Sequence, residues 1–128
     1  MKDNMFGFEK LEVWKETMTM TVGIYQLTAG FPKEEQYSLT DQLKRAMSAV
    51  PANIAEGNSR NTGKDKAHFL SIAYCSLMEV MNHLILANRL GYLNEEQLQD
   101  FRLNIEKSSA QISALRNYHT KNSFITNR

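Results

Sequence analysis

The chain has 128 residues, and its 15 basic and 14 acidic side chains almost cancel. This length predicts one domain, residues 1–128, with a substantial core, and the charge balance excludes a strong overall attraction to nucleic acid or acidic membranes. The single cysteine, Cys75, excludes an internal disulfide framework. It lies in an apolar run, where we expect a free thiol to behave as a small hydrophobic side chain in a reducing, cytoplasmic compartment.

We expect neither a secretory leader nor a membrane-spanning segment. The first ten residues are too charged for a leader, and no apolar run approaches the roughly 20 residues that a membrane span needs. The sequence therefore predicts a soluble protein.

The first predicted helix covers residues 9–29. Its apolar residues follow steps of three and four, which place them on one face, as in an amphipathic helix. Gly30 and Pro32 end the helix because proline disfavours helical geometry in the residue before it, and residues 33–36 are expected to form a short turn. The apolar face consists of Leu11, Trp14, Met18, Val22 and Tyr25.

The second predicted helix covers residues 38–56, and Gly57 is expected to end it in a left-handed conformation. Pro51 removes one backbone donor and leaves the Met47 carbonyl without its partner, so the helix should bend there. The apolar stripe of this helix is Leu39, Leu43, Ala46, Val50 and Asn53.

Two polar residues of the second helix need partners. Asn53 lies on the core stripe, where its usual contribution is a fixed register between helices. Glu56 lies in the last turn, where its carboxylate faces the negative end of the helix dipole. We expect a specific partner for it: Arg60, His68 or Ser76. We interpret these residues as a structural polar lock, with a ligand or partner site as the alternative.

Helices three and four are predicted at residues 64–90 and 95–119. Thr62 and Asp65 form the N-terminal signal of the third helix, Gly91 its stop, and Asn94 the cap of the fourth. Residues from Lys121 onward are expected to fray. Four helices with short connections predict an all-α fold, an antiparallel up-down four-helix bundle. The apolar stripes are Phe69, Ala73, Leu77, Val80, Leu84 and Ala87, and then residues 98, 101, 105, 108, 112, 115 and 119.

The third helix also has a second apolar stripe, formed by Met78, Met81 and Ile85. One interpretation is that a broadly buried central helix touches both neighbours in its own chain. The other is an interface between subunits, because exposed apolar patches usually mark association.

No catalytic, cofactor or metal site is evident. Residues 57–64 lack the spacing and the preceding strand of a phosphate-binding loop. Glu79 and His83 are four residues apart and unrepeated, so we expect an exposed helical pair and not half of a di-metal site. We therefore predict a non-enzymatic protein without a cofactor and with no small-molecule substrate evident.

One further pattern consists of Phe31, Pro32, Glu35, Leu39, Gln42 to Ala46, Ser48, Pro51 to Gly57, Arg60, Phe69, Leu70, Ala73, Ser76, Leu77, Glu79 and Gly91 to Leu93. On these residues the chain resembles the four-helix-bundle family of 23S rRNA-intervening-sequence proteins over residues 8–118. Most members of this family have no assigned activity. The resemblance implies a homo-oligomeric ring, typically a pentamer, and a related group of retroelement accessory proteins partners a reverse transcriptase and its RNA.

The sequence therefore favours a homo-oligomeric interaction or scaffold module that binds a protein partner. The alternative is an RNA-binding accessory protein. Its basis is the chain after residue 106, where the basic residues have no acidic residue among them, although the overall charge is far below that of the retroelement group. The basic residues are Lys107, Arg116, Lys121 and Arg128.

Overall fold

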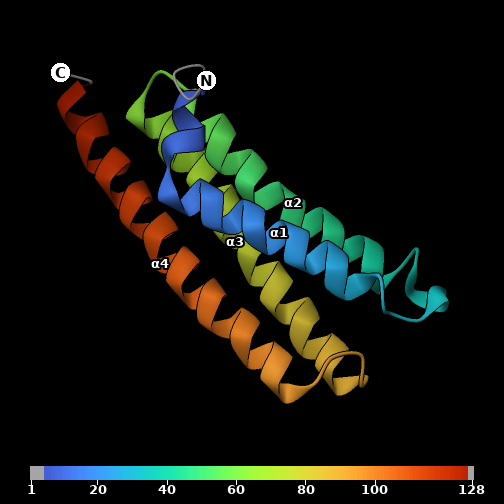
Figure 1. Cartoon of the computed structure of the whole chain (residues 1–128). Helices are drawn as coiled ribbons and strands as arrows, with labels where there is room; N and C mark the ends of the chain where they lie inside the picture. Colours follow the sequence, from blue (N-terminus) through green and yellow to red (C-terminus); the bar gives the residue numbers. More distant parts are fainter. Residues whose placement is uncertain (1–4, 127–128) are drawn as a thin grey trace.

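The computed structural model describes the backbone of residues 5–126 and the side chains as far as Asn122. These residues form four long helices, two short 3-10 helices and no strand (Figure 1). The all-α prediction is confirmed. The elements are η2 (Gly7–Lys10), α1 (Glu12–Thr28), η3 (Lys33–Glu35), α2 (Leu39–Asn58), α3 (Gly63–Arg89) and α4 (Glu95–Thr126).

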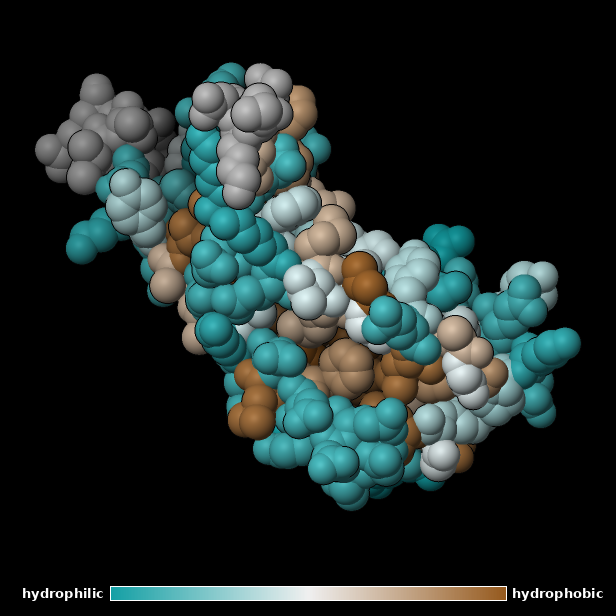
Figure 2. Space-filling view, in the orientation of Figure 1, coloured by the Kyte–Doolittle hydropathy of each residue, from teal (hydrophilic) through white to brown (hydrophobic). Residues whose placement is uncertain are grey.

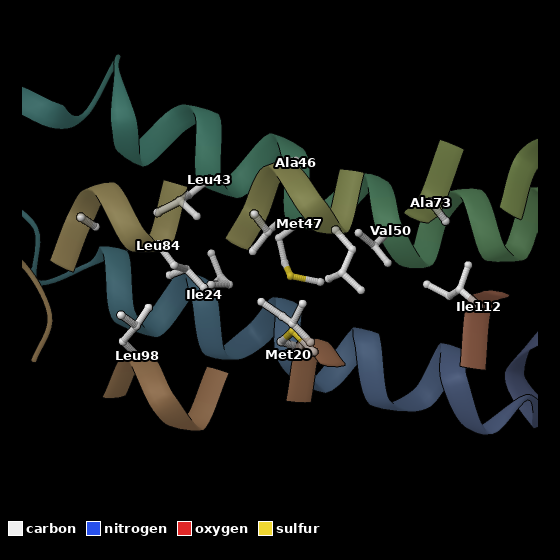
Figure 3. Packing of buried hydrophobic residues seen from close by; sticks show 14 of the residues in the cluster. Met20, Ile24, Leu43, Ala46, Met47, Val50, Ala73, Leu84, Leu98 and Ile112 are labelled. Carbon is white, nitrogen blue, oxygen red and sulfur yellow. The ribbon is translucent and has the colours of Figure 1, made fainter. Parts of the chain in front are cut away.

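The core lies between the helices and is made of aliphatic side chains. α3 packs along both α2 and α4, whereas α1 packs mainly on α2 and meets α4 at few points. Figure 3 shows Leu43 and Met47 of α2, Ile24 of α1 and Leu84 of α3 pointing into the same interior. The predicted stripes of α2, α3 and α4 supply most of this core. The large side chains with less than 2% exposure include Ile24, Leu43, Met47, Val50, Ile54, Leu77, Val80, Leu84 and Ile112.

The apolar face predicted for the first helix is not the face that α1 buries. Met18, Val22 and Tyr25 are 38%, 52% and 47% exposed. The buried face includes two threonines, Thr17 and Thr28, whose hydroxyls donate to carbonyl oxygens one turn earlier in the same helix. A hydroxyl satisfied within its own helix can be buried at little cost. Because threonine is polar, the pattern of apolar residues in the sequence did not identify the buried face of α1. That face is Val13, Thr17, Met20, Ile24 and Thr28.

Gly57 does not end α2, which continues in helical geometry to Asn58. The prediction of a left-handed stop at this residue was wrong. Gly57 is buried where α2 crosses α3, and a Cβ atom added to it would lie 3.1 Å from Cβ of Phe69 and 3.2 Å from the carbonyl oxygen of Lys66. The two backbones could not approach so closely with a side chain between them.

The stop predicted at Gly91 and the two predicted caps are confirmed. Gly91 has a φ of 84°, and its N–H donates to the Asn88 carbonyl at 3.0 Å. The Thr62 hydroxyl accepts from Asp65 N–H at 3.1 Å. Asn94 and Gln97 each accept a backbone N–H from the other through their side chains, at 2.8 and 2.9 Å. Each cap satisfies backbone donors that the first turn of the helix leaves free.

The fourth helix was predicted to end at residue 119 and the chain from Lys121 to fray, but α4 continues to Thr126. Residues 95–126 contain no glycine or proline, so nothing in the sequence breaks the helix there. Residues 127 and 128 lie outside the described part. The short turn predicted after Pro32 is present as the 3-10 helix η3. Tyr92 donates its hydroxyl to Glu35 at 2.8 Å, which ties η3 to the turn before α4 and raises the pKa of the tyrosine.

Two expectations about α3 are corrected. Cys75 is exposed, because it lies on the side of the helix away from the buried Ala73 and Leu77. In addition, α3 is by length and composition apolar enough to cross a membrane, although no such segment was expected. In this fold its most apolar stripe is buried against α2 and α4.

Candidate functional site

The outward side of α1 carries an exposed apolar stripe. Its residues belong to the face that periodicity predicted as the apolar side of an amphipathic helix. We call Met18, Val22 and Tyr25 the α1 face. The Lys44 ammonium of α2 lies over the Tyr25 ring, 4.8 Å from its centroid. Beside the face is a shallow hollow of about 530 Å³. In Figure 2 a few brown side chains lie along α1, and the larger apolar group at the centre of the visible surface lies between α1 and α4. The hollow is lined by Thr21, Val22, Tyr25, Gln26, Ala29 and Ser48.

The second stripe of α3 is less exposed than the α1 face. Met81 and Ile85 are half-buried and pack against the chain's own core. Met78 is 37% exposed. Two of the three residues proposed for a subunit interface therefore already have partners within the chain, as the alternative interpretation expected.

A groove of about 520 Å³ separates α1 from α4. One side of it is closed by an ion pair between Lys107 Nζ and Glu16 Oε2 at 3.3 Å. Ser108 lies on the core stripe of α4, is 1% exposed, and its hydroxyl has no hydrogen-bond partner among the described residues. The groove is lined by Glu12, Lys15, Glu16, Thr19, Met20, Gly23, Phe101, Asn104, Lys107 and Ser108.

Replacing Ser108 by alanine should leave the free energy of unfolding unchanged or raise it by up to about 1 kcal/mol. A buried hydroxyl without a partner costs about 1–3 kcal/mol, and alanine removes that cost together with the small packing contribution of the oxygen. Urea denaturation measures the difference. Thr17→Val is the matched control, since it removes a buried hydroxyl that is bonded to Val13 at 2.9 Å, and it should lower stability by about 1 kcal/mol. A larger loss for Ser108→Ala than for the control would contradict this expectation.

The polar residues of α2 interact mainly within their own helix. The Asn53 amide donates to the Ala49 carbonyl at 2.7 Å. Glu56 forms an ion pair at 2.9 Å with Arg60, one of its three expected partners. The Arg60 guanidinium also lies 4.5 Å from the Phe69 ring centroid and so reaches across to α3. Pro51 is buried in α2. Because the ion pair is about half exposed, it contributes little to stability. The role of these residues as a lock stays a prediction.

The remaining polar residues of α3 are separate from that group. Ser76 is half-buried. Glu79 and His83 form the expected helical pair at 3.3 Å, with 55% and 13% of their side chains exposed. The sequence predicted an exposed pair, but the His83 side chain is largely buried. Within residues 5–126, no group of three His, Cys, Asp or Glu side chains could hold a metal ion.

The basic residues of the C-terminal segment are partly engaged. Lys107 is compensated by Glu16 of α1, a partner that the charge count along the sequence could not show. The Arg116 guanidinium lies 5.5 Å from the Tyr74 ring centroid, and Lys121 is exposed. Arg128 lies outside the described residues.

A small cavity of about 180 Å³ at the end of the bundle was not expected from the sequence. The Lys66 ammonium donates to the Asn58 carbonyl at 2.9 Å at this cavity. Burial lowers the pKa of His119, and the positive charge of Lys66 lowers it further. Periodicity placed His119 on the α4 stripe, but only the fold brings it to Lys66. The cavity is lined by Leu11, Ile54, Gly57, Asn58, Lys66, Leu70, Leu115 and His119.

The fold and these surfaces define a small four-helix protein with an exposed apolar stripe on α1. The family model of the 23S rRNA-intervening sequence proteins matches residues 9–114, and the chain belongs to this family. A solved structure of similar fold is a protein of unknown function from the S23 ribosomal protein family of Bacteroides thetaiotaomicron. It is 20% identical, with a TM-score of 0.73, and the match covers 81% of this chain and 97% of that one. No curated protein matches the sequence significantly.

Proposed function

We propose that this protein is a non-enzymatic, cytoplasmic interaction or scaffold module. In this proposal it is an antiparallel up-down bundle whose copies assemble into a ring, with a pentamer as the expected state. The exposure of the α1 face supports the proposal. Three large apolar side chains follow one another along the outside of a helix, and such patches mark sites of association.

The α1 face is a better interface than the stripe of Met78, Met81 and Ile85. Met81 and Ile85 already pack within the chain, so a partner could gain little new burial from them. Met18, Val22 and Tyr25 do not pack against the core, although Lys44 lies over the Tyr25 ring, and the hollow beside them offers room for a neighbouring side chain. An interface between two unlike surfaces of identical copies closes into a ring when the rotation between them allows it.

Light scattering coupled to size exclusion tests the assembly. One chain has a mass of 14.7 kDa, and a pentamer should give about five times this mass at micromolar concentration. A mass of one chain under the same conditions would contradict the proposed assembly. A stable mass of another multiple would keep the scaffold proposal and replace the pentamer.

A second candidate function is RNA binding, with a reverse transcriptase as the further partner that the related group would imply. The observation in its favour is that the α2–α3 turn and the first turn of α3 carry three basic residues near the end of the bundle where α4 carries Arg116 and Lys121. A ring would repeat this basic end in every copy, which strengthens weak phosphate contacts. The three residues are Arg60, Lys64 and Lys66.

Replacing both Arg116 and Lys121 by alanine should weaken the binding of a structured RNA and reduce the dependence of affinity on salt. Each phosphate contact that is lost lowers the salt slope by about one. Fluorescence anisotropy at low and near-physiological salt measures both quantities. The matched control replaces Lys33 and Arg89, which lie at the other end of the bundle. Equal affinities for the two double variants, or no binding by the wild type at low salt, would remove RNA binding from consideration.

A further inference from the structure

The cavity at the end of the bundle is lined by residues from α2, α3 and α4 and by Leu11, the residue before α1. Its walls are aliphatic, and its polar groups are few. The hollow has a volume of about 180 Å³ and is partly open to solvent, since Asn58 of its lining is exposed. The aliphatic walls are Leu11, Ile54, Leu70 and Leu115.

The size and lining of the cavity suit a small apolar body. A cavity of about 150 Å³ lined by leucine, isoleucine and phenylalanine is large enough for benzene. The cavity found here is slightly larger and has leucine and isoleucine on four sides. It can therefore take a ring or a branched chain of about six carbon atoms.

The polar groups of the cavity suit an anion. The Lys66 ammonium is held in place by the Asn58 carbonyl at 2.9 Å, and a lysine ammonium has three donors, so two remain for other acceptors. His119 is the other titratable side chain at the cavity, and among the described residues none forms a hydrogen bond with its ring nitrogens. No acidic side chain lines the cavity.

We infer that this end cavity binds a small monocarboxylate with an apolar body of about six carbons, of which benzoate is the simplest probe. The body fills the space between Leu70 and Leu115. The carboxylate accepts hydrogen bonds from Lys66 and from a ring N–H of His119. Lys66 is the charged side chain that lines the cavity together with His119.

Binding of a carboxylate should be visible at His119. Burial, and then the positive charge of Lys66, hold the pKa of this histidine below its ordinary value. A bound anion attracts the proton and offsets the charge of Lys66, so it raises the pKa of His119. By linkage, benzoate should bind more tightly as the pH falls and the imidazole becomes protonated.

The test is an NMR titration of the full-length protein with sodium benzoate, read at the imidazole protons of His119 and the methyl groups of Leu70 and Leu115. We expect saturable shifts at these three residues and an increase of the His119 pKa. Benzyl alcohol has the same ring without the charge and should bind at least about tenfold more weakly, because it lacks the charge-assisted hydrogen bonds. Equal affinity for benzyl alcohol, or no saturable shift with benzoate, would overturn the inference.

Two pairs of variants locate the site. Lys66→Gln should weaken benzoate binding about tenfold, whereas Lys64→Gln, an exposed lysine outside the cavity, should not change it. Leu115→Phe should fill the cavity and abolish binding, whereas Leu103→Phe, 54% exposed on the same helix, should leave it intact. Benzoate that binds Lys66→Gln or Leu115→Phe as well as the wild type would place the ligand elsewhere and overturn the inference. Helicity measured by circular dichroism confirms that each variant is folded.

Discussion

Replacing Leu77 by alanine should lower the free energy of unfolding by about 2–5 kcal/mol. Leu77 has no exposed surface and lies on the central stripe of α3, between α2 and α4. The substitution removes the transfer free energy of the buried carbon atoms and leaves a cavity that close-packed neighbours fill only in part. Urea denaturation at a fixed protomer concentration measures the loss, because association also stabilises the folded chain.

Met78 is the matched control, since it is the next residue of the same helix and 37% exposed. Met78→Ala should change the free energy of unfolding by less than about 1 kcal/mol, as exposed substitutions usually do. A loss as large as that of Leu77→Ala would show that the second stripe of α3 is covered in the native protein. Such a loss would favour the stripe of Met78, Met81 and Ile85 as the interface between subunits.

Replacing Val22 by glutamate should dissociate the assembly into folded single chains. Val22 is at the centre of the α1 face and 52% exposed in one chain, so a glutamate there remains in water in the isolated chain. In an assembly through this face, the carboxylate would be buried without a partner, at a cost of several kcal/mol. Light scattering should therefore report 14.7 kDa, the mass of one chain.

The control for this prediction is Leu103→Glu, which adds the same charge at a leucine that is 54% exposed on α4. It should keep the mass of the wild type. Circular dichroism should show the same helicity in both variants, because neither residue belongs to the core. If the two variants have the same mass, the α1 face does not hold the copies together.

The sequence predicted helix caps, helix ends and ion pairs correctly where a few neighbouring residues decide the structure. The caps at Thr62 and Asn94 and the stop at Gly91 depend on hydrogen bonds or backbone freedom within one turn. The pairing of Glu56 with Arg60 depends on the spacing of four residues along a helix. Each of these features needs no knowledge of the other helices.

Features that depend on a second helix were missed or misread. Gly57 looks like a helix terminator in the sequence, but the approach of α3 explains why it has no side chain. Thr17 and Thr28 look like surface residues, and only the packing of α1 on its neighbours buries them. The partner of Lys107 on α1 and the cavity beside Lys66 and His119 both require residues far apart in the chain. Helical periodicity alone identifies an apolar stripe without saying whether the core or another molecule covers it.

Hydroxyl-radical footprinting read by mass spectrometry tests directly whether the α1 face is covered in the assembly. Met18 and Tyr25 are 38% and 47% exposed in one chain, and Tyr37 is 89% exposed outside the face. If the face joins the copies, Met18 and Tyr25 should be oxidised much less in the wild type than in Val22→Glu, while Tyr37 is labelled equally in both. Equal labelling of Met18 and Tyr25 in the two proteins would contradict assembly through the α1 face.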